Sequence, residues 1–158
     1  MTASSAARQR LAELGMRWPP MPPAHEFLPA VRAGELVFVS GHAPYTDGAF
    51  QYVGRVGETL DLLAAREAAR LAVLGCLVSL EQILGTLDAV KRIVKVNGYV
   101  HCVPGFEPLP RITDGASELL IDLFGRAGQH ARTTVGVASL PSGVAVELEL
   151  VALARPSA

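Results

Sequence analysis

The sequence has little cysteine and no long uninterrupted apolar run. Its two cysteines, Cys76 and Cys102, are too few for a disulfide framework, and its four histidines show no zinc-ligand spacing. The most apolar stretch, residues 60–87, contains charged side chains such as Arg66 and Glu81, so it does not predict a transmembrane helix. Residues 1–14 lack the continuous apolar segment of a signal peptide. We therefore expect a cytoplasmic protein with no membrane segment and no bound metal.

An excess of charge of either sign is also missing. The chain has 14 Lys+Arg and 15 Asp+Glu, with a formal net charge of −1. The densest basic cluster, Lys91, Arg92 and Lys95, is more typical of a solvated face than of a phosphate-binding surface. The chain has no phosphate-binding loop and no dinucleotide fingerprint, and Ser139 and Ser142 have no visible His and Asp partners. These absences predict no nucleic-acid partner, no cofactor and no covalent nucleophile.

Apolar residues, by contrast, are abundant. The chain has 158 residues, 50% of them hydrophobic, and its mean hydropathy is +0.32. That length fits one domain with its own core. Without a membrane segment, the excess of apolar residues favours burial against another subunit. We divide the chain into an N-terminal helix with a proline-rich arm, residues 1–21, and a single domain, residues 22–158.

Caps, breakers and hydrophobic periodicity predict the helices and strands. Gly15 ends a short first helix, and Gly85 ends a long helix that opens at Thr59 or Asp61. Alternating apolar residues between turn signals indicate the strands. The predicted helices cover residues 4–14, 59–84 and 110–124, and the main strands cover 28–32, 35–40, 93–103, 132–138 and 144–154.

This order of elements predicts an α+β fold. Strands, helix, strand, helix and strands give a mainly antiparallel sheet with the two main helices on one face. The other face of such a sheet also needs cover, which again favours packing between subunits.

The end of the sequence holds the strongest candidate for a binding site. Arg132 begins a predicted strand, and Glu147 lies on the strand expected to pair with it. An arginine fork binds a carboxylate through two parallel hydrogen bonds, and a nearby glutamate holds that arginine or acts as a general base on water. An Arg–Glu pair that only ties two strands together fits the spacing at least as well. Ser40-Gly41-His42 ends another strand, where backbone groups can line a pocket rim.

Three runs in the sequence resemble the RidA (YjgF) family. Residues 36–44, LVFVSGHAP, resemble that family's hydrophobic–Ser-Gly-Gln-x-Pro strand end. Residues 131–141, ARTTVGVASLP, and residues 146–152, VELELVA, resemble its AR-S-x-V-x-V-x-x-LP … VEIEAIA ending. The order and lengths of the elements between them also match, so the resemblance covers residues 22–154. The longer N-terminus and the loops at 54–57 and 125–132 are similar to a subfamily often labelled endoribonuclease L-PSP or translation initiation inhibitor.

The resemblance implies a chorismate-mutase-like fold that assembles as a homotrimer with clefts between subunits. It also implies hydrolysis of reactive enamine/imine intermediates, such as 2-aminoacrylate, to 2-keto acids and ammonia, without a cofactor or metal. On this resemblance Arg132 matches the arginine that binds the substrate carboxylate, and Glu147 matches the glutamate that places the hydrolytic water. Gly41 matches a residue that lines the cleft through its backbone.

Three substrate-binding positions depart from the family pattern. Phe27 stands where the family has a tyrosine, so a hydroxyl is lost. Thr134 stands where the family has a cysteine, and its hydroxyl still donates or accepts a hydrogen bond. His42 replaces a common glutamine. These departures keep open a second function, the binding of 2-keto acids without turnover, whereas the near-neutral charge disfavours the ribonuclease suggested by the subfamily label.

Overall fold

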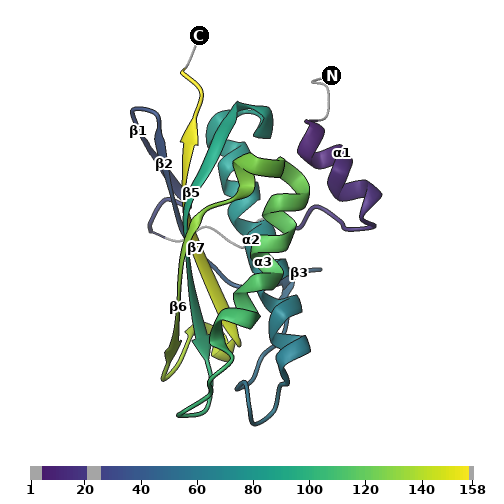
Figure 1. Cartoon of the computed structure of the whole chain (residues 1–158), viewed down its shortest axis with the longest axis vertical. Helices are drawn as coiled ribbons and strands as arrows, with labels where there is room; N and C mark the ends of the chain where they lie inside the picture. The colour runs from purple at the N-terminus through teal and green to yellow at the C-terminus, as the bar shows by residue number, and fades with distance from the viewer. Residues whose placement is uncertain (1–4, 21–25, 157–158) are drawn as a thin grey trace.

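The computed structural model describes residues 5–20 and 26–156, which form a layer of helices on a five-stranded sheet (Figure 1). The last residue of the predicted N-terminal segment, 21, and the first residues of the predicted domain, 22–25, therefore lie outside the described residues. In chain order the elements are α1 (Ala6–Glu13), β1 (Ala30–Ala33), β2 (Leu36–His42), β3 (Tyr45–Thr46), β4 (Ala49–Phe50), α2 (Leu62–Leu84), η1 (Leu87–Ala89), β5 (Val90–His101), α3 (Leu109–Phe124), η2 (Gly125–Gly128), β6 (Ala131–Val137), η3 (Pro141–Gly143) and β7 (Val146–Ala154). The predicted helices and main strands are all present, with ends that differ by a few residues.

The helices begin and end where the sequence signals stand. Ser5 caps α1 by accepting a hydrogen bond from the backbone N–H of Arg8, and Asp61 caps α2 by accepting one from Ala64. Gly85 ends α2 in the left-handed conformation, with φ of 80°, which glycine adopts without steric cost. The caps satisfy backbone groups that a helix leaves unpaired at its ends, and they fix the limits of α1 and α2.

The sheet is mixed, with the strand order β1-β2-β7-β5-β6. Three of its pairings are antiparallel, while β5 and β6 run parallel because α3 carries the chain across between them. Figure 1 shows α2 and α3 on the same side of the sheet, as predicted for an α+β fold. The expectation that Arg132 and Glu147 lie on paired strands is wrong, because β5 separates β6 from β7.

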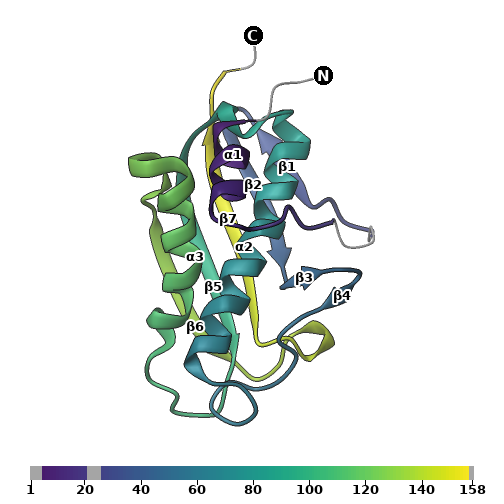
Figure 2. The same ribbon diagram turned by 90° about the vertical axis from the view of Figure 1, so that its right-hand side faces the viewer.

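The core lies between the sheet and the helices, with α2 at its centre (Figure 2). Most of the α2 side chains from Ala65 to Leu80 are buried, and α2 packs against the inner side of β2 and β7 and against α3. Alternation along β7 places Val146, Leu148 and Leu150 in this core and Glu147 on the other face. Among the described residues, no helix is long and apolar enough to cross a membrane.

The alternation of inward and outward side chains is interrupted near the start of β5. Regular alternation places Val94 with Val96 and Gly98, but the structure buries Ile93 and leaves Val94 37% exposed. The cause is an irregularity in the pairing of β5 with β7 between Ile93 and Lys95, which shifts the side chains by one position.

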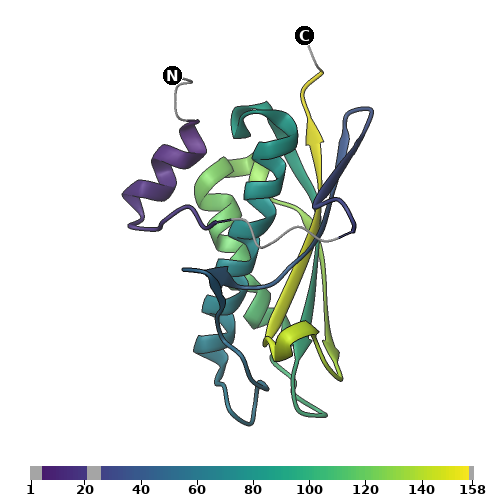
Figure 3. The same cartoon turned by 180° about the vertical axis from the view of Figure 1, so that it is seen from behind.

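The face of the sheet opposite the helices is open in this chain (Figure 3). Its exposed apolar side chains include Val31, Phe38 and Val135, with exposed fractions of 48%, 48% and 42%. Val31 and Phe38 are register partners on β1 and β2, whereas Val135 lies on β6 at the far edge. The apolar excess of the composition is thus placed partly on an uncovered sheet face, which we call the open face.

Candidate functional site

Arg132 and Glu147 lie on opposite faces of the sheet. Arg132 pairs in register with Val96, a core residue, and Glu147 pairs with Tyr99, which is one step out of phase with Val96. Because successive side chains on a strand point to opposite faces, Arg132 points to the helix side and Glu147 to the open face. Within one chain, the two predicted catalytic residues therefore do not form a joint site.

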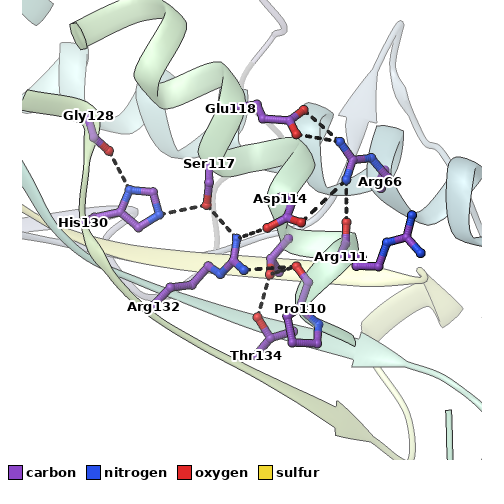
Figure 4. Close-up of polar contacts among 11 residues, drawn as sticks. Arg66, Pro110, Arg111, Asp114, Ser117, Glu118, Gly128, His130, Arg132 and Thr134 are labelled. Carbon is purple, nitrogen blue, oxygen red and sulfur yellow. Dashed lines mark hydrogen bonds and ion pairs between the residues drawn. The ribbon is translucent and has the colours of Figure 1, made fainter. Parts of the chain in front are cut away.

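The Arg132 guanidinium is held against α3 by three partners (Figure 4). Its Nη1 donates to the hydroxyl of Ser117 at 2.9 Å and forms an ion pair with Asp114 at 2.9 Å. Its Nη2 donates to the backbone carbonyl of Pro110 at 3.1 Å. The side chain keeps 21% of its surface exposed, so the guanidinium is fixed in orientation but still reaches solvent. Such a fixed cation suits the capture of a small carboxylate.

Asp114 links Arg132 to a second arginine. Arg66 of α2 lies 3.8 Å from the Asp114 carboxylate and binds Glu118 of α3 at 2.8 Å. It also donates to the carbonyl of Arg111 at 2.9 Å. Asp114 thus occupies a position between two guanidinium groups, and it neutralises part of the charge that Arg132 presents.

Ser117 and His130 complete the cluster, and sequence reasoning missed both. His130 lies two residues before Arg132, and Ser117 lies one helical turn after Asp114. The His130 Nε2 and the Ser117 Oγ are 3.0 Å apart, and Nδ1 lies 2.6 Å from the carbonyl of Gly128 (Figure 4). Burial lowers the pKa of His130, and the nearby Arg132 lowers it further against the raising effect of the Gly128 hydrogen bond. The ring is therefore neutral at neutral pH.

Thr134 belongs to the same side of β6. Its hydroxyl lies 2.6 Å from the hydroxyl of Thr113 in α3, and Thr113 also donates to the carbonyl of Pro110 at 3.1 Å. Because Thr113 donates to that carbonyl, Thr134 is the donor in the Thr–Thr contact. The structure thus brings Thr134 and Arg132 together on the helix side, where the Pro110 carbonyl accepts directly from Arg132 and is connected to Thr134 through Thr113.

Glu147 has its own surroundings on the open face. Its carboxylate lies over the backbone of Gly41, where an added Cβ would overlap Oε1. Burial raises the pKa of Glu147, and the neighbouring Glu149 raises it further. Glu149 accepts hydrogen bonds from Asn97 at 2.9 Å and from the Tyr99 hydroxyl at 2.8 Å. These contacts make a polar patch on β5 and β7, with Gly41 at its margin on β2.

Phe27 and His42 lie in different environments. The Phe27 side chain is 58% exposed, in the segment that precedes β1. His42 lies in the core rather than at a pocket rim. It is only 5% exposed, with Nε2 2.8 Å from the Ser79 hydroxyl on α2. The rim position was inferred from the end of β2, but the pairing irregularity between Val39 and His42 turns the imidazole inward.

A separate pocket of about 340 Å³ lies at the other end of β5 and β6. It is lined by residues such as Arg55, Cys102 and Phe106 and contains none of the predicted site residues. No group of His, Cys, Asp and Glu side chains among the described residues has the arrangement to hold a metal ion.

Comparisons with known proteins place the chain in a family. Residues 8–152 match the family described as "YjgF/chorismate_mutase-like, putative endoribonuclease". The chain is 36% identical over 151 residues to Protein TCP17 of Trypanosoma cruzi, which covers 94% of each sequence.

Two solved structures share the fold over nearly their whole length. Atu1372 of Agrobacterium tumefaciens, a protein of unknown function, is 34% identical with a TM-score of 0.88, covering 95% of this chain and 93% of that chain. A "putative endoribonuclease" of Shewanella oneidensis is 29% identical with a TM-score of 0.89, covering 93% of this chain and 98% of that one. With the α+β architecture already described, these matches establish that the chain belongs to the YjgF/RidA family.

Proposed function

We propose that this protein hydrolyses small enamine and imine intermediates of the 2-aminoacrylate type to 2-keto acids and ammonia. The observation that carries the proposal is the Arg132 guanidinium, which is oriented by Ser117, Asp114 and Pro110 while it remains open to solvent. A fixed guanidinium binds the carboxylate of a small acid in one orientation and so places the neighbouring imine carbon.

We further propose that the complete site forms between copies of the chain in a homotrimer. Arg132 and Glu147 face opposite sides of one sheet, so a joint site requires Arg132 of one protomer and Glu147 of its partner. The exposed apolar side chains of the open face support such packing, since a subunit interface removes them from water. Gly41 and Phe27 would then line the cleft from the side of the open face.

The hydrolysis of an imine requires few groups from the protein. A protonated imine carbon is already electrophilic, so hydrolysis needs a bound substrate, an oriented water and a group that accepts a proton. Glu147 supplies a carboxylate, with a pKa raised by burial and by Glu149, that orients the attacking water by accepting a hydrogen bond from it. No step of this hydrolysis requires a metal or an organic cofactor.

A non-catalytic binding function is the alternative, and one contact favours it. The Thr134 hydroxyl already donates to Thr113, so its hydrogen is not available to a ligand unless that contact breaks. Phe27 has no hydroxyl to contribute. A protein that keeps Arg132 to bind a carboxylate, but offers the ligand no hydroxyl from positions 134 and 27, binds 2-keto acids without hydrolysing the corresponding imines.

The two functions are separated by measuring turnover and binding on the same samples. Turnover is followed as keto acid formed from 2-aminoacrylate generated in situ, and binding is followed by calorimetry with 2-ketobutyrate. The deaminase function predicts a rate above the uncatalysed hydrolysis that falls about 10²-fold or more in Arg132→Ala. Binding that depends on Arg132 without any accelerated hydrolysis would establish the alternative instead. An unchanged rate in Arg132→Ala would contradict both.

A further inference from the structure

The hydrogen bonds around His130 have a fixed direction. Its Nδ1 lies 2.6 Å from the Gly128 carbonyl, and a carbonyl oxygen only accepts, so Nδ1 carries the hydrogen. In the neutral ring the lone pair is then on Nε2, 3.0 Å from the Ser117 hydroxyl. Ser117 therefore donates to His130 and accepts from Arg132, whose Nη1 is 2.9 Å from the same oxygen. One hydroxyl connects the carboxylate-binding cation to a base.

The core contains a similar pair that serves as an internal comparison. His42 donates from Nδ1 to the carbonyl of Ser40 at 2.6 Å and lies with Nε2 2.8 Å from Ser79. His42 and Ser79 are 5% and 1% exposed, so no substrate reaches them, and their contact holds β2 against α2. The His130 pair lies instead at the partly exposed margin of the sheet, beside a guanidinium. The two pairs share one hydrogen-bond pattern, so the pattern alone does not indicate chemistry. The partly exposed location of the His130–Ser117 pair beside Arg132 does.

We propose that Ser117 and His130 form a proton relay for hydrolysis at the Arg132 site, an inference that rests on the proposed function. Arg132 holds the carboxylate of the 2-imino acid while water attacks the iminium carbon. As the carbon–oxygen bond forms, the π electrons of the carbon–nitrogen bond move to nitrogen. The proton released by the water goes to Ser117 Oγ, and the hydroxyl proton of Ser117 passes to Nε2 of His130.

The same relay then works in reverse. His130 returns its proton through Ser117 to the amino nitrogen, and the carbon–nitrogen bond breaks as the carbonyl forms. The departing ammonia takes up the remaining hydroxyl proton. The sum is one iminium and one water converted to one 2-keto acid and one ammonium ion, with no oxidant or further reactant. Glu147 of a partner protomer orients the water in this scheme, and the relay moves the proton.

The surroundings of His130 keep its ring in the neutral form, which has a free lone pair on Nε2. Arg132 on β6 lies within reach of the ring through Ser117, Asp114 on α3 pairs with Arg132, and Arg92 on β5 donates to the Gln129 carbonyl at 3.2 Å. Burial and Arg132 lower the pKa of His130, so the ring is unprotonated and ready to accept near neutral pH. Asp114 is less suited, because its carboxylate is engaged by Arg132 and lies near Arg66.

The test compares His130→Gln, Ser117→Ala and Ser117→Thr with the wild type in the in-situ imine assay across pH. Gln keeps an acceptor for Ser117 but carries no titratable proton, and Thr keeps the hydroxyl. Ser139→Ala, at an exposed position outside the cluster, is the matched control. We expect kcat to fall about 10²-fold in His130→Gln and Ser117→Ala, because general acid–base assistance is typically of that size or larger. Ser117→Thr restores most of the rate.

Binding and pH dependence separate a relay from a merely structural role. The relay predicts that 2-ketobutyrate affinity stays within about twofold in His130→Gln, since Arg132 still holds the carboxylate. It also predicts a wild-type kcat that falls as acid protonates His130, and a flatter profile in His130→Gln. A kcat within about threefold of wild type in His130→Gln, or a ketobutyrate affinity that falls in step with kcat, would overturn the relay. If the wild type does not accelerate hydrolysis, the deaminase function fails and the relay fails with it.

Discussion

Arg132 and Glu147 face opposite sides of the same sheet, with strand β5 between the strands that carry them. A glutamate on the open face cannot assist a substrate held on the helix side of its own chain. The geometry of one protomer therefore separates the two predicted catalytic residues, and the proposed function requires Glu147 from another copy.

Mixing two inactive variants tests this division. Arg132→Ala and Glu147→Ala are each expected to lose most deaminase activity, because each lacks one half of the site. When the two are unfolded together and refolded at equal amounts, random assembly into trimers puts an intact Arg132 opposite an intact Glu147 in roughly a quarter of the sites. The keto acid assay then recovers about that fraction of wild-type activity. No recovery in trimers shown by native mass spectrometry to contain both variants would contradict a site shared between protomers.

On the proposed function, Asp114 would compete with the carboxylate of the ligand for Arg132, because it already forms an ion pair with the guanidinium. Replacing it in Asp114→Asn removes the competing charge while keeping a side chain of the same shape. Exposed ion pairs contribute about 0.2–1 kcal/mol, so the affinity for 2-ketobutyrate should rise by up to about fivefold in calorimetry. Asp122→Asn, on an exposed position of the same helix, is the control and should bind like the wild type. Weaker binding in Asp114→Asn would mean that Asp114 orients the guanidinium more than it competes.

Substitutions of Gly41 and Glu147 should have coupled effects on the free energy of unfolding. A Cβ at position 41 overlaps the Glu147 carboxylate, so Gly41→Ala forces that side chain or β2 to move. Overpacking costs about 1–3 kcal/mol in the free energy of unfolding, and we expect a loss at the low end of this range because the overlapping atoms are the end of a flexible side chain; denaturant titration measures it. Glu147→Ala removes the obstructing atoms, and the double variant should regain most of the loss. Additive losses in the double variant would show that Gly41 is needed for another reason.

His42 makes stability depend on pH in a defined direction. Burial lowers the pKa of His42 below its ordinary value of 6.5, despite the hydrogen bond to the Ser40 carbonyl. Below about pH 6.5 the unfolded chain takes up a proton that the folded chain resists, so stability falls as the pH drops. His42→Gln should therefore have a lower Tm than the wild type at pH 7.5 and a smaller difference from it at pH 5. His130, whose pKa is also lowered, is present in both proteins and cancels in the comparison. A difference that does not narrow at pH 5 would contradict the prediction.

The sequence predicts the elements of this fold well because their signals are local. Asp61 and Gly85 limit α2 through their own backbone and side-chain geometry, and alternation along β7 separates Leu148 from Glu147. Local signals do not predict which strands lie next to each other, because the pairing depends on where α3 returns the chain to the sheet. That is why β6 was expected beside β7 and is found beside β5.

Local sequence signals also fail to predict the neighbours of the site residues. Arg132 stands out because it carries a family motif, but its partners Ser117 and Asp114 lie on a helix whose contact with β6 no spacing in the sequence reveals. His42 looked like a rim residue because it follows a glycine at a strand end, and a pairing irregularity turns it into the core. In each case the surroundings of the residue depend on tertiary contacts that the sequence pattern does not reveal.

The direct partners of Arg132 and Thr134 come from one continuous stretch of chain, residues 110–134, in which the short helix η2 separates α3 from β6. The surroundings of Glu147 come instead from β2, β5 and β7, which are distant in sequence. The two halves of the proposed site can therefore change independently. Substitutions on the open face that replace Glu147 leave the Arg132 cluster untouched, so the proposed hydrolase would lose turnover and keep the binding of small carboxylates.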